Sequence, residues 1–155
     1  MLQLCGCRII DAYRNDPKRI EREHAEEVFQ LLIDKDTDAL IELFSEDARE
    51  NHDLEEEWEV FFEAIDGNLE SYRSVYFPIE GYGKDQNGEV FDSHLFVNYN
   101  NVTTDTGAVY SDFGYYLDAV DPNYPELEGI DFFCFTDPDT GEEYMVGGVS
   151  EEYLY

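Results

Sequence analysis

Basic residues are scarce in this sequence, and none follows Lys84. Lys and Arg number 9 against 38 Asp and Glu in a chain of 155, which gives a formal net charge of −29 at pH 7. A protein that binds nucleic acid must neutralise phosphates with cations, so this composition excludes nucleic acid as an expected partner. Direct adsorption to an anionic membrane is excluded for the same reason. The acidity favours solubility through self-repulsion, or a cationic partner.

Cysteines and long apolar runs are also few. The three cysteines, Cys5, Cys7 and Cys134, do not form a pattern typical of a disulfide framework. Cys134 lies among phenylalanines, and we interpret it as a small buried thiol. No apolar run approaches the roughly 20 residues that a membrane-spanning helix needs. Gly-rich phosphate loops, nucleophile elbows and zinc-ligand spacings are absent, so we expect no cofactor and no metal.

The first seven residues contain one processing motif. Leu4-Cys5-Gly6-Cys7 resembles the lipobox of bacterial lipoproteins, in which the last Cys is lipidated. Only six residues precede Cys7 and none is basic, whereas a full signal peptide has a basic start and an apolar stretch. A truncated lipobox predicts an extracytoplasmic protein held at the membrane by a lipid on Cys7. A chance match would leave a cytoplasmic protein, and the Cys-x-Cys pair could instead serve redox or metal chemistry.

Apolar periodicity in the first half predicts three helices. Residues 17–35 form the first helix, with Asp16 as its cap and Pro17 at its first position. Residues 37–44 form a second, short helix, and 45–52 read as a polar linker. The third helix begins after Asp53 and ends at Asp66-Gly67. The apolar stripes of the first and third helices include Val28, Phe29 and Leu32, and Trp58, Phe61 and Phe62.

From residue 68 the apolar period changes to two, which predicts strands. Strands are expected at 69–79, 89–102, 108–120, 130–135 and 142–146. Short turns rich in Asp, Asn and Gly join them, so the sheet is expected to be antiparallel. We therefore predict an α+β domain of three N-terminal helices packed on a curved antiparallel sheet. It spans residues 16–149, after a lead-in at 1–15 and before a tail at 150–155.

The strand predicted at 108–120 has two distinct faces. Alternation places one set of side chains toward the core: Val109, Phe113, Tyr115, Leu117 and Ala119. The other set is expected to face water: Tyr110, Asp112, Tyr116 and Asp118. This tyrosine and aspartate face could bind a sugar or a protein partner, but exposed aromatics on a wet face are also ordinary.

Several segments carry a resemblance to known families. Residues 36–49 are similar to the opening of the nuclear transport factor 2-like superfamily, whose fold is a cystatin-like cone of curved sheet and helices. Residues 43–54, 61–67 and 104–107 resemble an uncharacterised bacterial lipoprotein family, domain of unknown function 5104. The resemblance covers about residues 20–147 and implies the cone. It implies no activity, because superfamily members include both small enzymes and binding or scaffolding domains.

Enzymes of that superfamily place an acid–base pair in the mouth of the cone, so the histidines are the candidate catalytic residues that the resemblance implies. Asp92 and His94 are two apart on a predicted strand and share one face, which we expect to be the wet face. His24 borders the apolar stripe of the first helix and could reach into a cone. Neither candidate has a third orienting group in the sequence, so catalysis is the alternative rather than the expectation.

The expected site is instead an aromatic pocket between helices and sheet. Its predicted lining is Trp58, Leu95, Tyr99, Phe113 and Tyr115, with His24 near its rim. Aromatic walls with few charges suit a small amphipathic molecule or a protein partner's side chain. The sequence thus predicts a non-catalytic ligand- or protein-binding domain. One alternative is a small cofactor-free isomerase, dehydratase or hydrolase; another is a homodimer-forming interaction module whose cone is filled.

Overall fold

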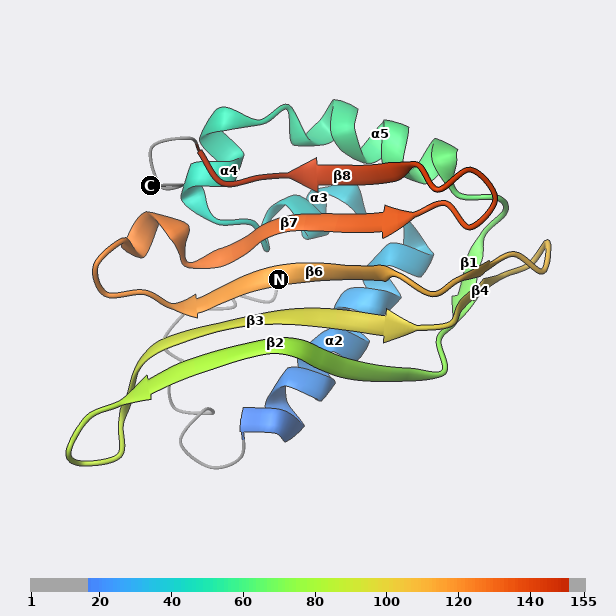
Figure 1. Cartoon of the computed structure of the whole chain (residues 1–155). Coiled ribbons are helices and arrows are strands. Elements are labelled where there is room, and N and C mark those ends of the chain that lie inside the picture. The colour runs from blue at the N-terminus through green and yellow to red at the C-terminus, as the bar shows by residue number, and fades with distance from the viewer. Residues whose placement is uncertain (1–16, 151–155) are drawn as a thin grey trace.

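The computed structural model describes residues 17–150, in which four helices precede the strands (Figure 1). They are α2 (Pro17–Asp34), α3 (Thr37–Ile41), α4 (Glu46–Asn51) and α5 (Leu54–Ala64). The α+β class is confirmed, and the predicted Asp53 cap of α5 is present because its side chain accepts from the Glu56 amide at 3.3 Å. The proposed cap Asp16 lies outside the described residues.

The expected linker at 45–52 is wrong, because it contains α4. The Ser45 hydroxyl accepts a hydrogen bond from the Ala48 amide at 3.2 Å and so caps this helix. Glu46 and Asp47 follow in the first turn, where acidic side chains interact favourably with the helix dipole. A serine followed by two acidic residues was therefore the signal for a fourth helix.

Two antiparallel sheets follow the helices. The main sheet has the strand order β2-β3-β6-β7-β8, and the small sheet has the order β1-β4-β5. The main strands are β2 (Ser74–Lys84), β3 (Val90–Asn100), β6 (Phe113–Val120), β7 (Gly129–Thr136) and β8 (Glu143–Gly147). The small strands are β1 (Leu69–Ser71), β4 (Val102–Thr104) and β5 (Val109–Tyr110), and a 3-10 turn, η1 (Pro125–Leu127), precedes β7. Antiparallel pairing is thus confirmed.

Three predicted strands are each divided between the two sheets. The segment 69–79 becomes β1 and β2, 89–102 becomes β3 and the start of β4, and 108–120 becomes β5 and β6. The division at residue 101 coincides with Asn101, whose φ of 53° leaves the extended region. Residues 111 and 112 lie between β5 and β6, so the alternation of side chains does not continue from one strand to the other. Tyr110, expected on the wet face, is buried, and Val109, expected in the core, is 46% exposed.

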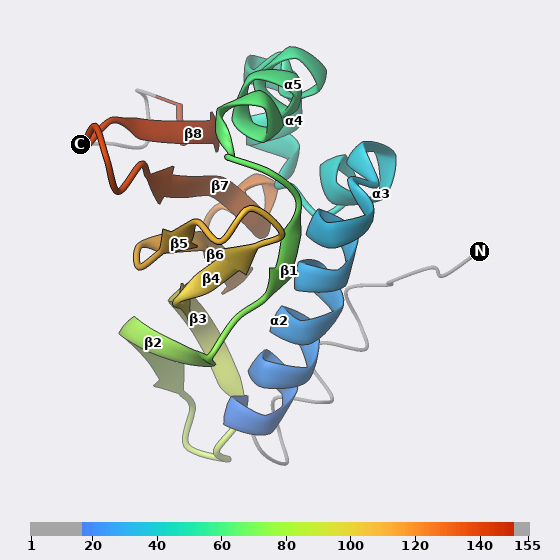
Figure 2. The same ribbon diagram turned by 90° about the vertical axis from the view of Figure 1, so that its right-hand side faces the viewer.

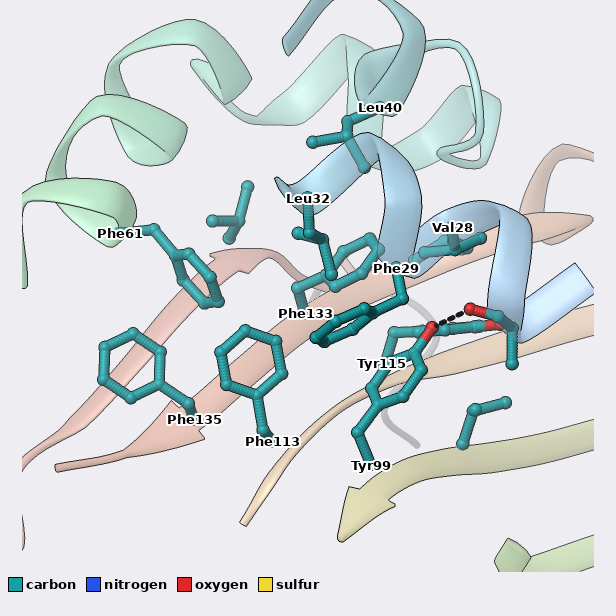
Figure 3. Packing of buried hydrophobic residues seen from close by; sticks show 14 of the residues in the cluster. Val28, Phe29, Leu32, Leu40, Phe61, Tyr99, Phe113, Tyr115, Phe133 and Phe135 are labelled. Atoms are coloured by element: carbon teal, nitrogen blue, oxygen red, sulfur yellow. Dashed lines mark hydrogen bonds between the residues drawn. The ribbon is translucent and has the colours of Figure 1, made fainter. Parts of the chain in front are cut away.

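The helices lie together on one side of the main sheet (Figure 2). The buried cluster joins α2 and α5 to the inner face of the strands, and Figure 3 shows its aromatic side chains packed between these elements. Trp58 is fully buried and its ring centroid lies 4.9 Å from that of Phe133 on β7. The predicted stripes of the first and third helices thus face the sheet. Figure 1 looks onto the opposite, outer face, which no described helix covers.

Candidate functional site: a groove on the outer face of the sheet

A row of apolar side chains crosses the outer face of the main sheet. Ile79, Phe96, Tyr116, Phe132 and Gly147 are successive cross-strand partners on β2, β3, β6, β7 and β8. Their chain neighbours point the other way, because side chains alternate along a strand. The rings of Tyr116 and Phe132 are stacked, with centroids 5.8 Å apart and planes 7° from parallel. We call Ile79, Phe96, Tyr116 and Phe132 the outer row.

An open groove of about 640 Å³ lies over the outer row. Met145 on β8 adds a flexible apolar side chain to it, and this residue is 46% exposed. Ile79 is 54% exposed at the opposite margin. This volume falls within the range of sites that hold small molecules, and its lining is largely apolar with a few polar groups, as such sites require.

Three carboxyl groups also line the groove: Asp118 on β6, Asp131 on β7 and Glu143 on β8. Asp131 is the extra residue of a β-bulge: Phe132 pairs with Tyr116 and Ile130 pairs with Leu117, so Asp131 has no partner on β6. Bulges of this kind redirect a side chain relative to the ladder. Asp131 is 1% exposed, although it belongs to the uncovered face of the sheet.

The environments of Asp118 and Asp131 disfavour their charged forms. Burial raises the pKa of Asp131 to about 8, and the charge of Asp118 adds to the increase. Burial, then Asp121, raises the pKa of Asp118 to about 6, while His94 opposes the increase. Burial also raises the pKa of Tyr116 to about 12. At neutral pH Asp131 is therefore mostly a neutral carboxylic acid, and perturbed groups of this kind in a cleft are candidates for function.

The predicted pair Asp92 and His94 lies on this same outer face, beside the groove. Its His94 Nδ1 and Asp92 Oδ1 atoms are 3.8 Å apart, which is too far for a hydrogen bond, and both side chains are more than a third exposed. The His94 ring lies nearly parallel to that of Tyr116, with centroids 6.4 Å apart. The expected wet location is thus confirmed, and this geometry is that of a loose surface ion pair.

The five side chains predicted to line an interior pocket are all buried. Their exposed fractions are 0–1%: Trp58, Leu95, Tyr99, Phe113 and Tyr115. The ring of Tyr99 lies 6.1 Å from that of Tyr115 and 6.4 Å from that of Phe113 (Figure 3). They pack as a core between helices and sheet, which is the arrangement expected of a filled interior. Their binding a ligand stays a prediction.

His24 lies at the edge of this core. Its Nδ1 is 3.3 Å from the Tyr115 hydroxyl, and burial lowers the pKa of the imidazole, which favours its neutral form. The neighbouring Ala25 carbonyl accepts a hydrogen bond of 2.6 Å from the Tyr99 hydroxyl, drawn as a dashed line in Figure 3. These two contacts attach α2 to the sheet. His24 meets a tyrosine here, and no ion pair with a carboxylate is formed among the described residues.

The third histidine does meet a carboxylate. His52 Nδ1 lies 3.0 Å from Glu57 Oε1, and the second oxygen of Glu57 accepts a hydrogen bond of 2.6 Å from the Gly147 amide. A shallow depression of about 450 Å³ lies beside His52. One oxygen of Glu57 thus contacts His52, at the end of α4, and the other joins α5 to the edge of β8. This pair stabilises the fold at a sheet edge that would otherwise leave an amide unpaired.

Sequence reasoning found part of the groove and missed the rest. It placed Tyr116 and Asp118 on a wet face that could bind a partner, and the structure confirms that placement. It missed Asp131, whose position depends on a bulge, and it missed Phe132 within an apolar run that reads as core. The uninterrupted run Phe132-Phe133-Cys134-Phe135 was the available signal, since a strand with one wet face should alternate.

Comparison with known proteins gives one family. The model of a family described as a domain of unknown function (DUF5104) matches residues 27–132. No curated protein matches the chain. Within residues 17–150, no helix is both long enough and apolar enough to cross a membrane. Cys7, the predicted lipidation site, lies outside the described residues.

Proposed function

The chain belongs to the family described as a domain of unknown function (DUF5104), and because that description names no activity, we propose a function from its own geometry. The domain binds a small amphipathic molecule, without catalysis, in the groove over the outer row. One observation carries this proposal: an open groove of about 640 Å³ combines stacked aromatic rings with a buried carboxyl group on a face that no described helix covers.

The apolar contents of the groove support binding. Phe96, Tyr116 and Phe132 offer partly exposed aromatic surface, against which flat or aliphatic groups pack, and aromatic pairs are worth about 0.5–1.5 kcal/mol beyond the area they bury. Met145 adapts its shape to irregular ligands because its side chain is unbranched and flexible. A polar side chain at each position would serve solubility better, so the row has a cost that binding explains.

The enzyme alternative has weaker support. Asp92 and His94 are separated by 3.8 Å and are both open to water, and a catalytic base needs a close orienting partner. His52 does have a carboxylate partner, but that carboxylate already accepts from the Gly147 amide. In the dimer alternative the groove would be the interface between two chains. Each chain carries a net charge of −29, so electrostatic repulsion would oppose their association.

A ligand screen followed by matched variants tests the proposal. Hits from a thermal-shift screen of small amphipathic compounds should raise the Tm of the full chain, since a ligand of the native state stabilises it by mass action. Ile79→Glu and Met145→Glu should abolish those shifts. Val109→Glu is the control, because Val109 is equally exposed, at 46%, but lies on β5 outside the groove. Hits that bind both groove variants unchanged would move the site elsewhere, with the interior pocket as the next candidate.

Two finer proposals accompany this one. The order of helices followed by a long-stranded antiparallel sheet supports a nuclear transport factor 2-like fold for residues 16–149. The segment Leu4-Cys5-Gly6-Cys7 supports a lipid on Cys7 and therefore an extracytoplasmic protein held at the membrane. A ligand-binding domain in that location would meet its ligand outside the cytoplasm.

A further inference from the structure

We propose that the ligand of this groove is a small organic cation, an amine or guanidinium on an apolar body, whose charge lies against Asp131 and Asp118. The inference rests on the proposed function, and it specifies the chemical class of the ligand. It depends on three observations: the orphaned carboxyl of Asp131, the sign of the charges around the groove, and the position of the outer row beside them.

Asp131 lacks the partners that a buried carboxyl normally has. Neither of its oxygens, both of which are shielded from water, has a hydrogen-bond partner of strict geometry among the described residues, and a looser hydrogen bond with the Ser45 side chain opposes the increase in its pKa. Buried polar atoms are almost always paired, so an unpaired one that lines a groove needs an explanation. A ligand N–H that donates to Asp131 removes this deficit, and Asp118 supplies a second acceptor in the same groove.

The surrounding charges select a cation. None of the described side chains that line the groove is basic. Asp118 faces Asp92 and His94 from β3 and Asp121 and Glu128 from the loop before β7. Of these five groups His94 alone can become positive, and an anion would meet repulsion from the other four.

The groups around Asp131 are also mostly acidic. The groups that act on it are Asp118 on β6, Asp47 on α4, Asp121, and the hydroxyl of Ser45. A ligand cation would neutralise this concentration of negative charge, and its effect would be strong because Asp131 is shielded from water.

An inorganic ion fits the groove poorly. Within residues 17–150, no group of three or more His, Cys, Asp or Glu side chains could hold a metal ion. The rest of the lining is aromatic and aliphatic, whereas hard divalent cations need six or more oxygen ligands. An organic cation uses both parts, because ammonium and guanidinium groups also interact with aromatic side chains, and Phe96, Tyr116 and Phe132 line the groove.

The class of ligand follows from the size of the groove. At about 640 Å³ it suits a molecule with one charged end and a body of one ring or a short alkyl chain. The body would lie over the outer row, with the charge toward Asp118 and Asp131. A protein partner would need a larger area than this groove, since specific interfaces bury about 800 Å² on each side.

The test compares 4-phenylbutylamine with 4-phenylbutan-1-ol, its neutral counterpart of the same length, by titration calorimetry on the full chain. The amine should bind at least about tenfold more tightly than the alcohol. Asp118→Asn and Asp131→Asn should each weaken amine binding by about tenfold and leave alcohol binding unchanged. Asp112→Asn is the matched control, since Asp112 is exposed and lies outside the groove.

A second measurement does not depend on any variant. The amine remains protonated at pH 7, so its binding should ionise Asp131 and release up to one proton, seen as a dependence of the binding enthalpy on the ionisation heat of the buffer. Binding of the alcohol should show no such dependence.

The outcomes separate the two proposals. If both probes bind equally and Ile79→Glu abolishes both, the groove stands and the cation inference is wrong. If neither probe binds at millimolar concentration, or if sedimentation shows a dimer that Ile79→Glu dissociates, both proposals are overturned.

Discussion

Tyr116 and Phe132 stack across neighbouring strands on the uncovered face of the sheet, with centroids 5.8 Å apart and planes 7° from parallel. The residue that precedes Phe132, Asp131, is displaced by a β-bulge and buried at the same place. A pair of stacked aromatic side chains thus lies beside a buried carboxyl group that lacks a hydrogen-bond partner of strict geometry. In the interior, by contrast, the His24 and Tyr99 side chains make polar contacts that join α2 to the sheet.

The burial of Trp58 predicts a large effect on stability. Trp58 is fully buried, with ring contacts to Phe61 and Phe133, so Trp58→Ala should lower the free energy of unfolding by about 3–5 kcal/mol. Val60→Ala on the same helix is the control, because Val60 is 53% exposed, and it should change the free energy by no more than about 0.5 kcal/mol. Equal urea midpoints for the two variants would contradict the described packing of α5.

The helices and the antiparallel pairing of the strands were largely predictable from the sequence, whereas the division into two sheets was not. Periodicity found α2, α3 and α5 because their apolar stripes are long or well capped, and it missed α4 because a six-residue helix has too few apolar positions to show a period. It found the antiparallel order because the turns are rich in Asp and Gly. It could not separate the two sheets, since a strand that bends at Asn101 reads as one continuous strand.

The candidate site was less predictable than the fold, for a physical reason. Alternation assigned Tyr116 and Asp118 to the wet face, because both lie in a regular part of β6. A bulge shifts the register by one residue, and after it the face of each side chain no longer follows from its number. Asp131 lies at that shift, so only the structure brings it to Asp118.

Asp131 should make stability depend on pH. Its pKa rises from 3.8 to about 8 on folding, so the folded state holds this proton more tightly than the unfolded state. The resulting stabilisation is complete below pH 4 and is lost progressively as the pH rises toward 8. Because the pKa of Asp118 is raised to about 6, its protonation also stabilises the folded state, and this contribution is lost at a lower pH.

Urea denaturation of the wild type and of Asp131→Asn between pH 4 and 9 measures this effect. The stability of the variant relative to wild type should increase with pH across that window, because the amide cannot ionise. Asp112→Asn controls for the removal of one charge from a chain of −29 and should show no such trend. Parallel pH profiles of stability for wild type and Asp131→Asn would show that folding does not raise the pKa of Asp131.

Cys134 should be an unreactive thiol although it lines the groove. Burial, then Glu143, raises its pKa to about 12, which leaves very little thiolate at pH 8. In a chain with Cys5→Ser and Cys7→Ser, iodoacetamide should modify Cys134 at least about 100-fold more slowly than it modifies free cysteine. Unfolding in urea should restore the ordinary rate. A native rate equal to that of free cysteine would contradict the described surroundings of the thiol.

Lipidation of Cys7, on which the proposed extracytoplasmic location depends, can be tested separately. If Cys7 is the lipidated residue, the gene should encode a basic and apolar segment upstream of Met1, and a fatty-acid analogue should label the full-length protein in bacteria. The Cys7→Ser form should remain unlabelled, and Cys5→Ser serves as the control that keeps its label. Equal labelling of the Cys7→Ser form, or an in-frame stop codon immediately upstream, would end this proposal.

Met145 offers the most direct measurement of the central claim, that the outer groove is the binding site. The chain has only 2 methionines, Met1 and Met145, so a methyl-labelled sample gives two resolvable signals. Met145 lines the groove and is 46% exposed, whereas Met1 lies outside the described residues. Titration with 4-phenylbutylamine should shift the Met145 methyl resonance saturably, and Ile79→Lys, which places a like charge at the margin of the groove, should abolish the shift. Saturable binding that leaves the Met145 resonance unmoved would contradict the account.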